Sequence, residues 1–119
     1  RDGHLKQLTK DHSLVQAQID QGMIRLDEAR GHALRNIILR AVGVKEKLDP
    51  DLISGTLQEG DIYLLCSDGL SDMVEDDRIE QFLRSSSDLE NILDDLIIAA
   101  KDSGGKDNIT VVLVGYYAD

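Results

Sequence analysis

The chain of 119 residues contains no tryptophan, one phenylalanine, one proline and one cysteine. With aromatics at 3%, the core has to be built from aliphatic side chains. A single cysteine, Cys66, excludes an intrachain disulfide and is typical of a reducing compartment. Because Cys66 lies inside an apolar run, we expect a small core residue there rather than a nucleophile.

Long apolar runs and basic residues are also scarce. No run approaches the roughly 20 residues of a membrane-spanning helix, and the polar start Arg1-Asp2-Gly3-His4 does not resemble a signal peptide. These features predict a soluble cytoplasmic protein that does not engage membranes. The chain has 13 basic and 23 acidic residues, a formal charge of −10, which argues against a nucleic-acid surface. Most of the acids are expected on a solvated face, and a minority could concentrate cations.

The length allows one domain or less, with helices of clear amphipathic pattern. Residues 88–102 carry an apolar stripe at helical spacing, and Ser87 with Glu90 has the pattern of a capping box. Gly104-Gly105 is expected to end this helix. Shorter helices are predicted at 13–21, with Ser13 or Asp11 as N-cap and Gly22 as stop, at 26–30, and at 76–84.

Strands are predicted at several places between these helices. The runs 52–57 and 62–67 are expected to form an antiparallel pair through a turn at 58–61, and further strands are expected at 5–8 and 37–42. The run 109–115 is apolar on both faces, typical of a central strand. Arg1-Asp2-Gly3 has the pattern of a hairpin turn. Together these helices and strands predict a layered α+β fold. One long helix can cover only one face of the sheet, as expected of part of a larger fold.

Two acidic residues lie where apolar strands meet glycine-containing turns. Asp68 follows the run 62–66, and Asp107 precedes the run 109–114. A carboxylate at the tip of a buried strand needs a cation or hydrogen-bond donors, and carboxylate oxygens are ligands that Mg²⁺ and Mn²⁺ prefer. Asp72, four residues after Asp68, has helical spacing to it. The alternatives are that Asp68 caps a helical turn, that Asp107 holds a glycine-rich turn, and that Asp72 is a surface carboxylate.

The residue spacing does not match other common metal- or phosphate-binding motifs. The segment from Asp68 to Met73 lacks the ligand pattern of an EF-hand loop, and Gly104-Gly105-Lys106 ends a helix without the following Ser or Thr of a phosphate loop. The three histidines do not cluster at metal-ligand spacing. His32 is the best placed of them to approach a site, although a structural role is favoured.

The residues in order resemble a known family. The matching segments are Arg1-Asp2-Gly3 to Leu8-Thr9-Lys10-Asp11-His12-Ser13, Asn36-Ile37-Ile38 with Arg40-Ala41-Val42-Gly43, Gly60-Asp61 to Cys66-Ser67-Asp68-Gly69-Leu70, and Gly105-Lys106-Asp107-Asn108-Ile109-Thr110-Val111. Together they resemble the C-terminal half of the metal-dependent protein serine/threonine phosphatases of the PPM (type 2C) family, in particular the compact bacterial members. The pairing of Ser-Asp-Gly-Leu with Asp-Asn-Ile-Thr is the specific part of this likeness.

The resemblance implies a four-layer α-β-β-α sandwich, of which residues 1–119 supply about half, with a flap at about residues 11–35. It implies Asp68, Asp107 and Asp72 as ligands of Mn²⁺ or Mg²⁺, two and in some members three ions per complete domain. Further residues implied near the substrate or flap are His32, Asn36, Arg40 and Asn108. No residue of this chain is assigned a catalytic role beyond the metal ligands.

The implied reaction is hydrolysis of phosphoserine or phosphothreonine in proteins, the products of a Ser/Thr kinase, by a metal-activated hydroxide. Ala33 and Leu39 depart from the common bacterial pattern, where Pro and Thr are usual. The family's first metal-bridging aspartate and its phosphate-binding arginine have no counterpart here, so the isolated chain is expected to be inactive. The alternatives are a phosphatase-like interaction module without catalysis and an acidic cation-binding domain. Open sheet edges predict self-association.

Overall fold

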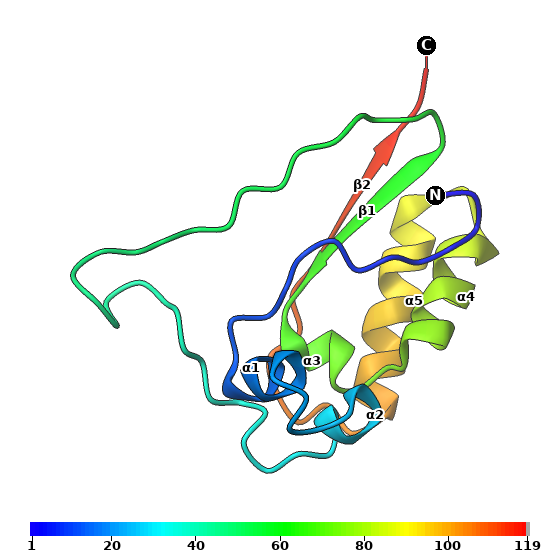
Figure 1. The fold of residues 1–119 in the computed structure, drawn as a ribbon. Coiled ribbons are helices and arrows are strands. Elements are labelled where there is room, and N and C mark those ends of the chain that lie inside the picture. Colours follow the sequence, from blue (N-terminus) through cyan, green and yellow to red (C-terminus); the bar gives the residue numbers. More distant parts are fainter. Residues whose placement is uncertain (119) are drawn as a thin grey trace. The chain divides into compact units, whose positions relative to one another are not determined.

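The computed structural model describes residues 1–118, and these form two compact units. Unit 1 comprises Arg1–Lys6 and the chain from Gly55 onward, and unit 2 comprises Gln7–Ser54. Unit 2 contains α1 (Leu14–Asp20) and α2 (Leu26–Ala29). Unit 1 contains, in order, β1 (Asp61–Cys66), α3 (Asp68–Ser71), α4 (Asp76–Ser85), α5 (Leu89–Asp102) and β2 (Val111–Tyr116) (Figure 1).

The sheet of unit 1 is a two-stranded antiparallel ribbon. Strand β1 pairs with β2 in a register that runs from Asp61 opposite Tyr116 to Cys66 opposite Val111. The predicted pairing of 52–57 with 62–67 is therefore wrong, and 52–57 forms no strand. The reason is that Ser54-Gly55 interrupts that run in its middle, whereas β2 offers the valine-rich run Val111–Val114 to β1. The turn predicted at 58–61 is confirmed: the Asp61 amide donates to the Gln58 carbonyl over 3.0 Å.

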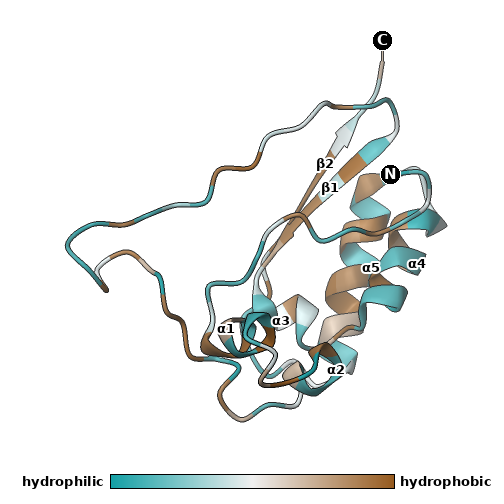
Figure 2. Ribbon diagram, viewed as in Figure 1, coloured by the Kyte–Doolittle hydropathy of each residue, from teal (hydrophilic) through white to brown (hydrophobic). Residues whose placement is uncertain are grey.

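The core of unit 1 lies between its helices and the ribbon. Helix α5 contacts α4, α3 and β2, and its apolar side faces them (Figure 2). The predicted helices 88–102 and 76–84 are confirmed, as are the short helices of unit 2. The fully buried residues come mainly from α5, and the core cluster consists of Leu70, Val74, Ile79, Ile92, Leu96, Ala99 and Ala100.

The ends of α5 have specific polar caps. Asp88, not Ser87, is the N-cap, and its carboxylate accepts a 2.9 Å hydrogen bond from the Glu90 amide. The predicted capping box of Ser87 and Glu90 does not form, because the N-cap lies one residue later and the Asp88 carboxylate accepts from the Glu90 amide. Gly105 at φ 51° ends the helix as predicted, and its amide donates to the Ala100 carbonyl.

Three strand predictions need correction. Residues 5–8 and 37–42 form no strand. In the second run, Ile38 and Val42 each form one isolated β-bridge, with Ser13 and Lys45 respectively. Alternating polarity without a neighbouring strand to bond to leaves the backbone irregular. Strand β2 is half-buried on one face and exposed on the other, so the expectation of a strand covered on both faces is not met in the described residues.

The turn at the start of the chain is confirmed. Asp2 and Gly3 have φ of 53° and 77°, and the His4 amide donates to the Arg1 carbonyl over 3.0 Å. Two positive φ values are the signature of a type I′ turn. Cys66 is exposed, contrary to the prediction of a core residue, because it is the last residue of β1 and is not among the residues that pack against the core cluster.

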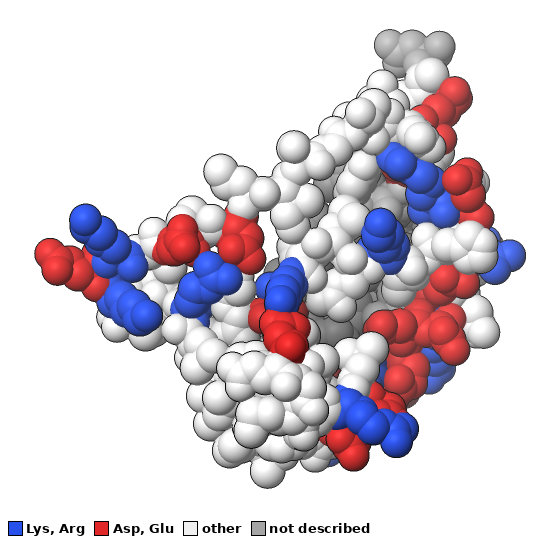
Figure 3. All heavy atoms as spheres, viewed as in Figure 1, with Lys and Arg blue, Asp and Glu red and all other residues white. Residues whose placement is uncertain are grey.

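None of the helices in residues 1–118 combines the length and apolarity that crossing a membrane requires. On the face drawn in Figure 3, Lys and Arg atoms lie next to Asp and Glu atoms rather than forming one continuous basic region.

Candidate functional site

Asp68 is placed by the junction of β1 and α3. Strand β1 ends at Cys66, Ser67 is extended at φ −75° and ψ 165°, and Asp68 is the first residue of the single-turn helix α3. Gly69 follows, and the backbone at Asn108 passes close to it. A Cβ at Gly69 would lie 2.1 Å from the Asn108 carbonyl oxygen, so only glycine allows this approach. The Asp68 side chain is exposed at the end of the ribbon.

Asp107 is placed by the turn that leads from α5 into β2. Gly104 and Gly105 have φ of 133° and 51° and reverse the chain after the helix. The Asp107 carboxylate then accepts a 2.6 Å hydrogen bond from the Asn108 amide, which fixes one oxygen of the side chain against its own turn. Asp107 and Asn108 are both exposed.

Ser67 connects these two segments. Its amide donates to the Thr110 carbonyl over 3.0 Å, and its hydroxyl accepts from the Thr110 amide over 3.0 Å. The same hydroxyl donates to the Asn108 carbonyl over 3.1 Å. These bonds continue the β1–β2 ladder beyond its last pair. The strand ends next to Asp68 and Asp107 are therefore neighbours, whereas the sequence pattern predicts a pairing of 62–67 with 52–57.

Asp72 lies on the same helical turn as Asp68. It is the C-cap of α3, is half-buried, and its amide donates to the Asp68 carbonyl over 2.8 Å. Its helical spacing to Asp68 is thus as predicted. Whether its carboxylate ligates a metal stays a prediction.

The donor chemistry of this end of unit 1 fits a hard divalent cation. Asp68 and Asp107 offer carboxylate oxygens on two hydrogen-bonded segments, and the glycine at 69 keeps those segments in contact. Within residues 1–118, no group of three or more His, Cys, Asp or Glu side chains is arranged to hold a metal. The two carboxylates are hard oxygen donors, and neither is a redox-active or soft donor.

The surroundings of Cys66, next to this site, do not favour a nucleophilic thiolate. Desolvation raises the pKa of its thiol, and the charge of Asp68 adds to the effect. A raised pKa leaves less thiolate at neutral pH, whereas a nucleophilic cysteine needs a lowered pKa. The sequence-based exclusion of cysteine chemistry is consistent with this environment.

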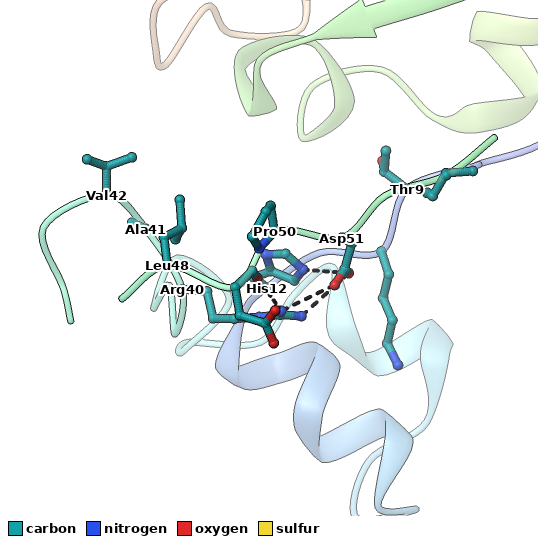
Figure 4. A pocket seen from close by; sticks show the side chains of 11 residues that line it. Thr9, His12, Arg40, Ala41, Val42, Leu48, Pro50 and Asp51 are labelled. Atoms are coloured by element: carbon teal, nitrogen blue, oxygen red, sulfur yellow. Dashed lines mark hydrogen bonds and ion pairs between the residues drawn. The ribbon is translucent and has the colours of Figure 1, made fainter. Parts of the chain in front are cut away.

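Unit 2 contains a pocket of about 360 Å³, lined by polar and apolar side chains in similar numbers (Figure 4). At one side His12, Arg40 and Asp51 point toward one another. The Asp51 carboxylate is 2.8 Å from His12 Nε2 and 3.2 Å from an Arg40 guanidinium nitrogen. These contacts hold the pKa of Asp51 below its usual range, and the hydrogen bond with His12 has the largest effect. Arg40 also donates to the Asp49 carbonyl over 2.8 Å.

The sequence-predicted residues of unit 2 have structural partners of their own. His32 Nδ1 accepts a 3.1 Å hydrogen bond from the Leu34 amide, which agrees with the structural role favoured for this histidine. Asn36 is exposed, and Arg40 is bonded to Asp51. Asp51 was missed by the sequence reasoning. Its position thirty-nine residues after His12 gives no local signal, and only the fold brings the two together.

Comparisons with known proteins agree with the geometry of unit 1. A scan against models of known protein families gave no match. The serine/threonine phosphatase stp of Listeria monocytogenes is 44% identical over 110 residues, which are 92% of this chain and 44% of that protein. The crystal structure of the Mycobacterium tuberculosis serine/threonine phosphatase PstP/Ppp superposes with a TM-score of 0.93 at 41% identity, covering 99% of this chain and 49% of that one.

A second structure bears on the metal. The catalytic domain of PstP in complex with two manganese ions superposes with a TM-score of 0.82 at 41% identity, over 95% of this chain and 46% of that one. The chain therefore shares the α+β architecture of about half of these serine/threonine phosphatase structures. The chain corresponds to part of a PPM-type serine/threonine phosphatase domain. It spans about half the length of most of the curated relatives it matches.

Proposed function

We propose that this chain is the C-terminal, metal-binding half of a protein phosphatase that hydrolyses phosphoserine and phosphothreonine. The observation that carries the proposal is the junction at Ser67, where hydrogen bonds hold the segments of Asp68 and Asp107 side by side. Carboxylates in this arrangement suit a hard cation, and phosphoryl transfer depends mainly on positioning and charge neutralisation. The relatives named as serine/threonine phosphatases support the reaction class.

In this proposal Asp68, Asp107 and Asp72 contribute to holding Mn²⁺ or Mg²⁺, two ions per complete domain and, as in some family members, a third. When bound, the metal pair supplies Lewis-acid activation of water and neutralises charge on the phosphoryl oxygens. The chain's own contribution is to hold the carboxylates on short, hydrogen-bonded turns. The manganese in the PstP structure supports the metal class without distinguishing the two ions.

Unit 2 is proposed to regulate access of the substrate. Residues 11–35 form the flap, and His32, Asn36, Arg40 and, from unit 1, Asn108 are proposed as residues near the substrate. The contact of Arg40 with Asp51 implies a structural role for the arginine as well, since a paired guanidinium has fewer donors left for a phosphate. The substrate class is a phosphoprotein made by a Ser/Thr kinase, and the proposed compartment is the cytoplasm.

The test uses a chimera in which this chain replaces the matching residues of the Listeria phosphatase stp. We expect Mn²⁺-dependent hydrolysis of a phosphothreonine peptide by the chimera and none by the isolated chain. In the chimera Asp107→Asn should lower kcat/KM at least a hundredfold, on the order of the loss of a transition-state electrostatic contact. Asp94→Asn, an exposed aspartate of α5, is the matched control and should keep the activity.

Two outcomes would contradict the proposal. A folded chimera that binds Mn²⁺ without hydrolysing the peptide would favour a phosphatase-like interaction module. Full activity in the Asp107→Asn chimera would remove this aspartate from the metal site.

A further inference from the structure

Ser67 has the position of a helix cap, but its hydroxyl does not cap the helix. It is the residue before α3, where a serine usually accepts a hydrogen bond from an amide of the first turn. No such bond is present. The hydroxyl instead accepts from the Thr110 amide over 3.0 Å and donates to the Asn108 carbonyl over 3.1 Å. Both hydrogen-bonding functions of the hydroxyl are therefore used on the turn that contains Asp107.

The contact reaches the Asp107 carboxylate through one peptide. The Asn108 carbonyl accepts from Ser67, and the Asn108 amide donates to the Asp107 carboxylate over 2.6 Å. Any rotation of the residues around Asn108 would break one of these bonds and turn the carboxylate. On the other side, Asp68 follows Ser67 directly, so one side chain sits between the two candidate ligands.

Close packing around Asn108 makes the Ser67–Asn108 contact sensitive to substitutions at position 67. The Asn108 carbonyl lies so close to Gly69 that a Cβ there would be 2.1 Å from its oxygen. Without the hydroxyl, the Asn108 carbonyl and the Thr110 amide lose their partners at a place where the backbone has little room. A change at position 67 is therefore expected to move the turn rather than leave it in place.

We propose that Ser67 is a positioning residue, whose hydroxyl sets the affinity of the site for divalent cations by fixing Asp107 relative to Asp68. The inference rests on the proposed function, because it takes these aspartates as ligands. Groups that orient metal ligands typically change metal affinity by ten- to a hundredfold, about the range expected here.

The test compares Ser67→Ala with Ser67→Thr, which keeps the hydroxyl, in the intact chain. Mn²⁺ is titrated while paramagnetic broadening of the Asp68, Asp107 and Asn108 amide signals is followed by NMR. We expect Ser67→Ala to weaken apparent Mn²⁺ binding about tenfold and to speed hydrogen exchange at the Thr110 amide. Ser67→Thr, which keeps the hydroxyl, should stay within about threefold of the wild type, below the tenfold lower end of that range. Ser85→Ala is the matched control, because the Ser85 hydroxyl donates to the Phe82 carbonyl over 2.7 Å, at the end of α4.

The outcomes separate the two proposals. Equal Mn²⁺ affinity in the wild type and Ser67→Ala, or a loss in Ser67→Thr as large as in Ser67→Ala, would overturn the positioning role alone. Absence of broadening at Asp68 and Asp107 in a folded wild type, with a protected Thr110 amide, would contradict the metal site of the proposed function. If Ser67→Ala does not fold, Ser67→Cys, with a weaker donor, is compared with Ser67→Thr, and equal affinities would again overturn the role.

Discussion

At the scale of single residues, Asp61 shows how the fold of unit 1 depends on the first residue of the chain. Its carboxylate is buried, with 3% of the residue exposed, and receives two hydrogen bonds from the Arg1 guanidinium at 2.8 and 2.7 Å. The Gln58 amide and the Tyr63 hydroxyl also donate to it. A carboxylate in this position is stable only with such partners. The bond to Arg1, followed by that to Gln58, holds the pKa of Asp61 well below its usual range.

The Arg1–Asp61 pair gives unit 1 a pH-dependent stability. Because the pKa of Asp61 is lowered in the folded state, the stabilisation is present above the usual aspartate pKa of about 4 and is lost as the pH falls through the lowered value. Arg1→Ala should lower the melting temperature at pH 7 and make it fall less steeply between about pH 5 and pH 2 than in the wild type. Thermal denaturation followed by circular dichroism over this range measures the effect.

An exposed arginine–aspartate pair provides the control. Arg25 and Asp27 are bonded on the surface of unit 2, with 77% and 62% of their side chains exposed. Surface pairs contribute little, so Arg25→Ala should leave the melting temperature nearly unchanged. Equal effects of Arg1→Ala and Arg25→Ala would show that burial of Asp61 does not matter.

Gly69 is the second residue on which the site depends. A methyl group there would collide with the Asn108 carbonyl, and backbone atoms cannot move away as a flexible side chain can. Gly69→Ala is expected to lower the free energy of unfolding by about 1–3 kcal/mol, the usual cost of overpacking. Gly55→Ala is the control, because a Cβ at position 55 would meet no other atom within 4 Å. Chemical denaturation measures both, and a Gly69→Ala variant as stable as Gly55→Ala would refute the close approach.

At the scale of elements, α5 carries the core. Leu96 is fully buried at 0% exposure, while Ile98 on the same helix is 54% exposed. Leu96→Ala should therefore lower the free energy of unfolding by about 2–5 kcal/mol, because it leaves a cavity among core side chains. Ile98→Ala should cost clearly less. Urea denaturation of both variants tests the assignment, and similar losses would place the core elsewhere.

The helices could be predicted from the sequence because their signals are local. The apolar stripe of 88–102, its acidic start and its double glycine end all lie within the helix or next to it. The strands could be predicted only in part, since a strand also needs a partner. The run 52–57 has strand-like residues but does not pair, and β1 finds its partner about fifty residues later in β2.

The same distinction applies to the candidate site. The positions of Asp68 and Asp107 beside strand ends could be predicted because each stands at the junction of an apolar run and a glycine-containing turn, and their role as metal ligands stays a prediction. The role of Ser67 could not, because its hydroxyl bonds to residues more than forty positions away. His12 and Asp51 are equally remote in the sequence, and their contact depends on the irregular loops of unit 2.

At the scale of the whole molecule, the two-stranded ribbon has open edges. In the described residues β1 and β2 have only each other as partners, and Leu65, Val112 and Val114 are about half exposed. Unpaired edges with apolar neighbours favour association with further strands. We therefore propose that the chain self-associates, and sedimentation at tens of micromolar, on the order of concentrations at which open edges associate, should show species larger than the monomer. A strictly monomeric chain would contradict this.

The central claim is that Asp68 and Asp107 serve one metal site. The most direct measurement is kcat/KM for a phosphothreonine peptide in the stp chimera with Asp68→Asn, Asp107→Asn and both. When two residues act as a unit, replacing both lowers kcat/KM no more than replacing either one. The double variant should therefore be about as inactive as either single variant. Losses that multiply in the double variant would mean that the two aspartates act independently, and the account of a shared site would be wrong.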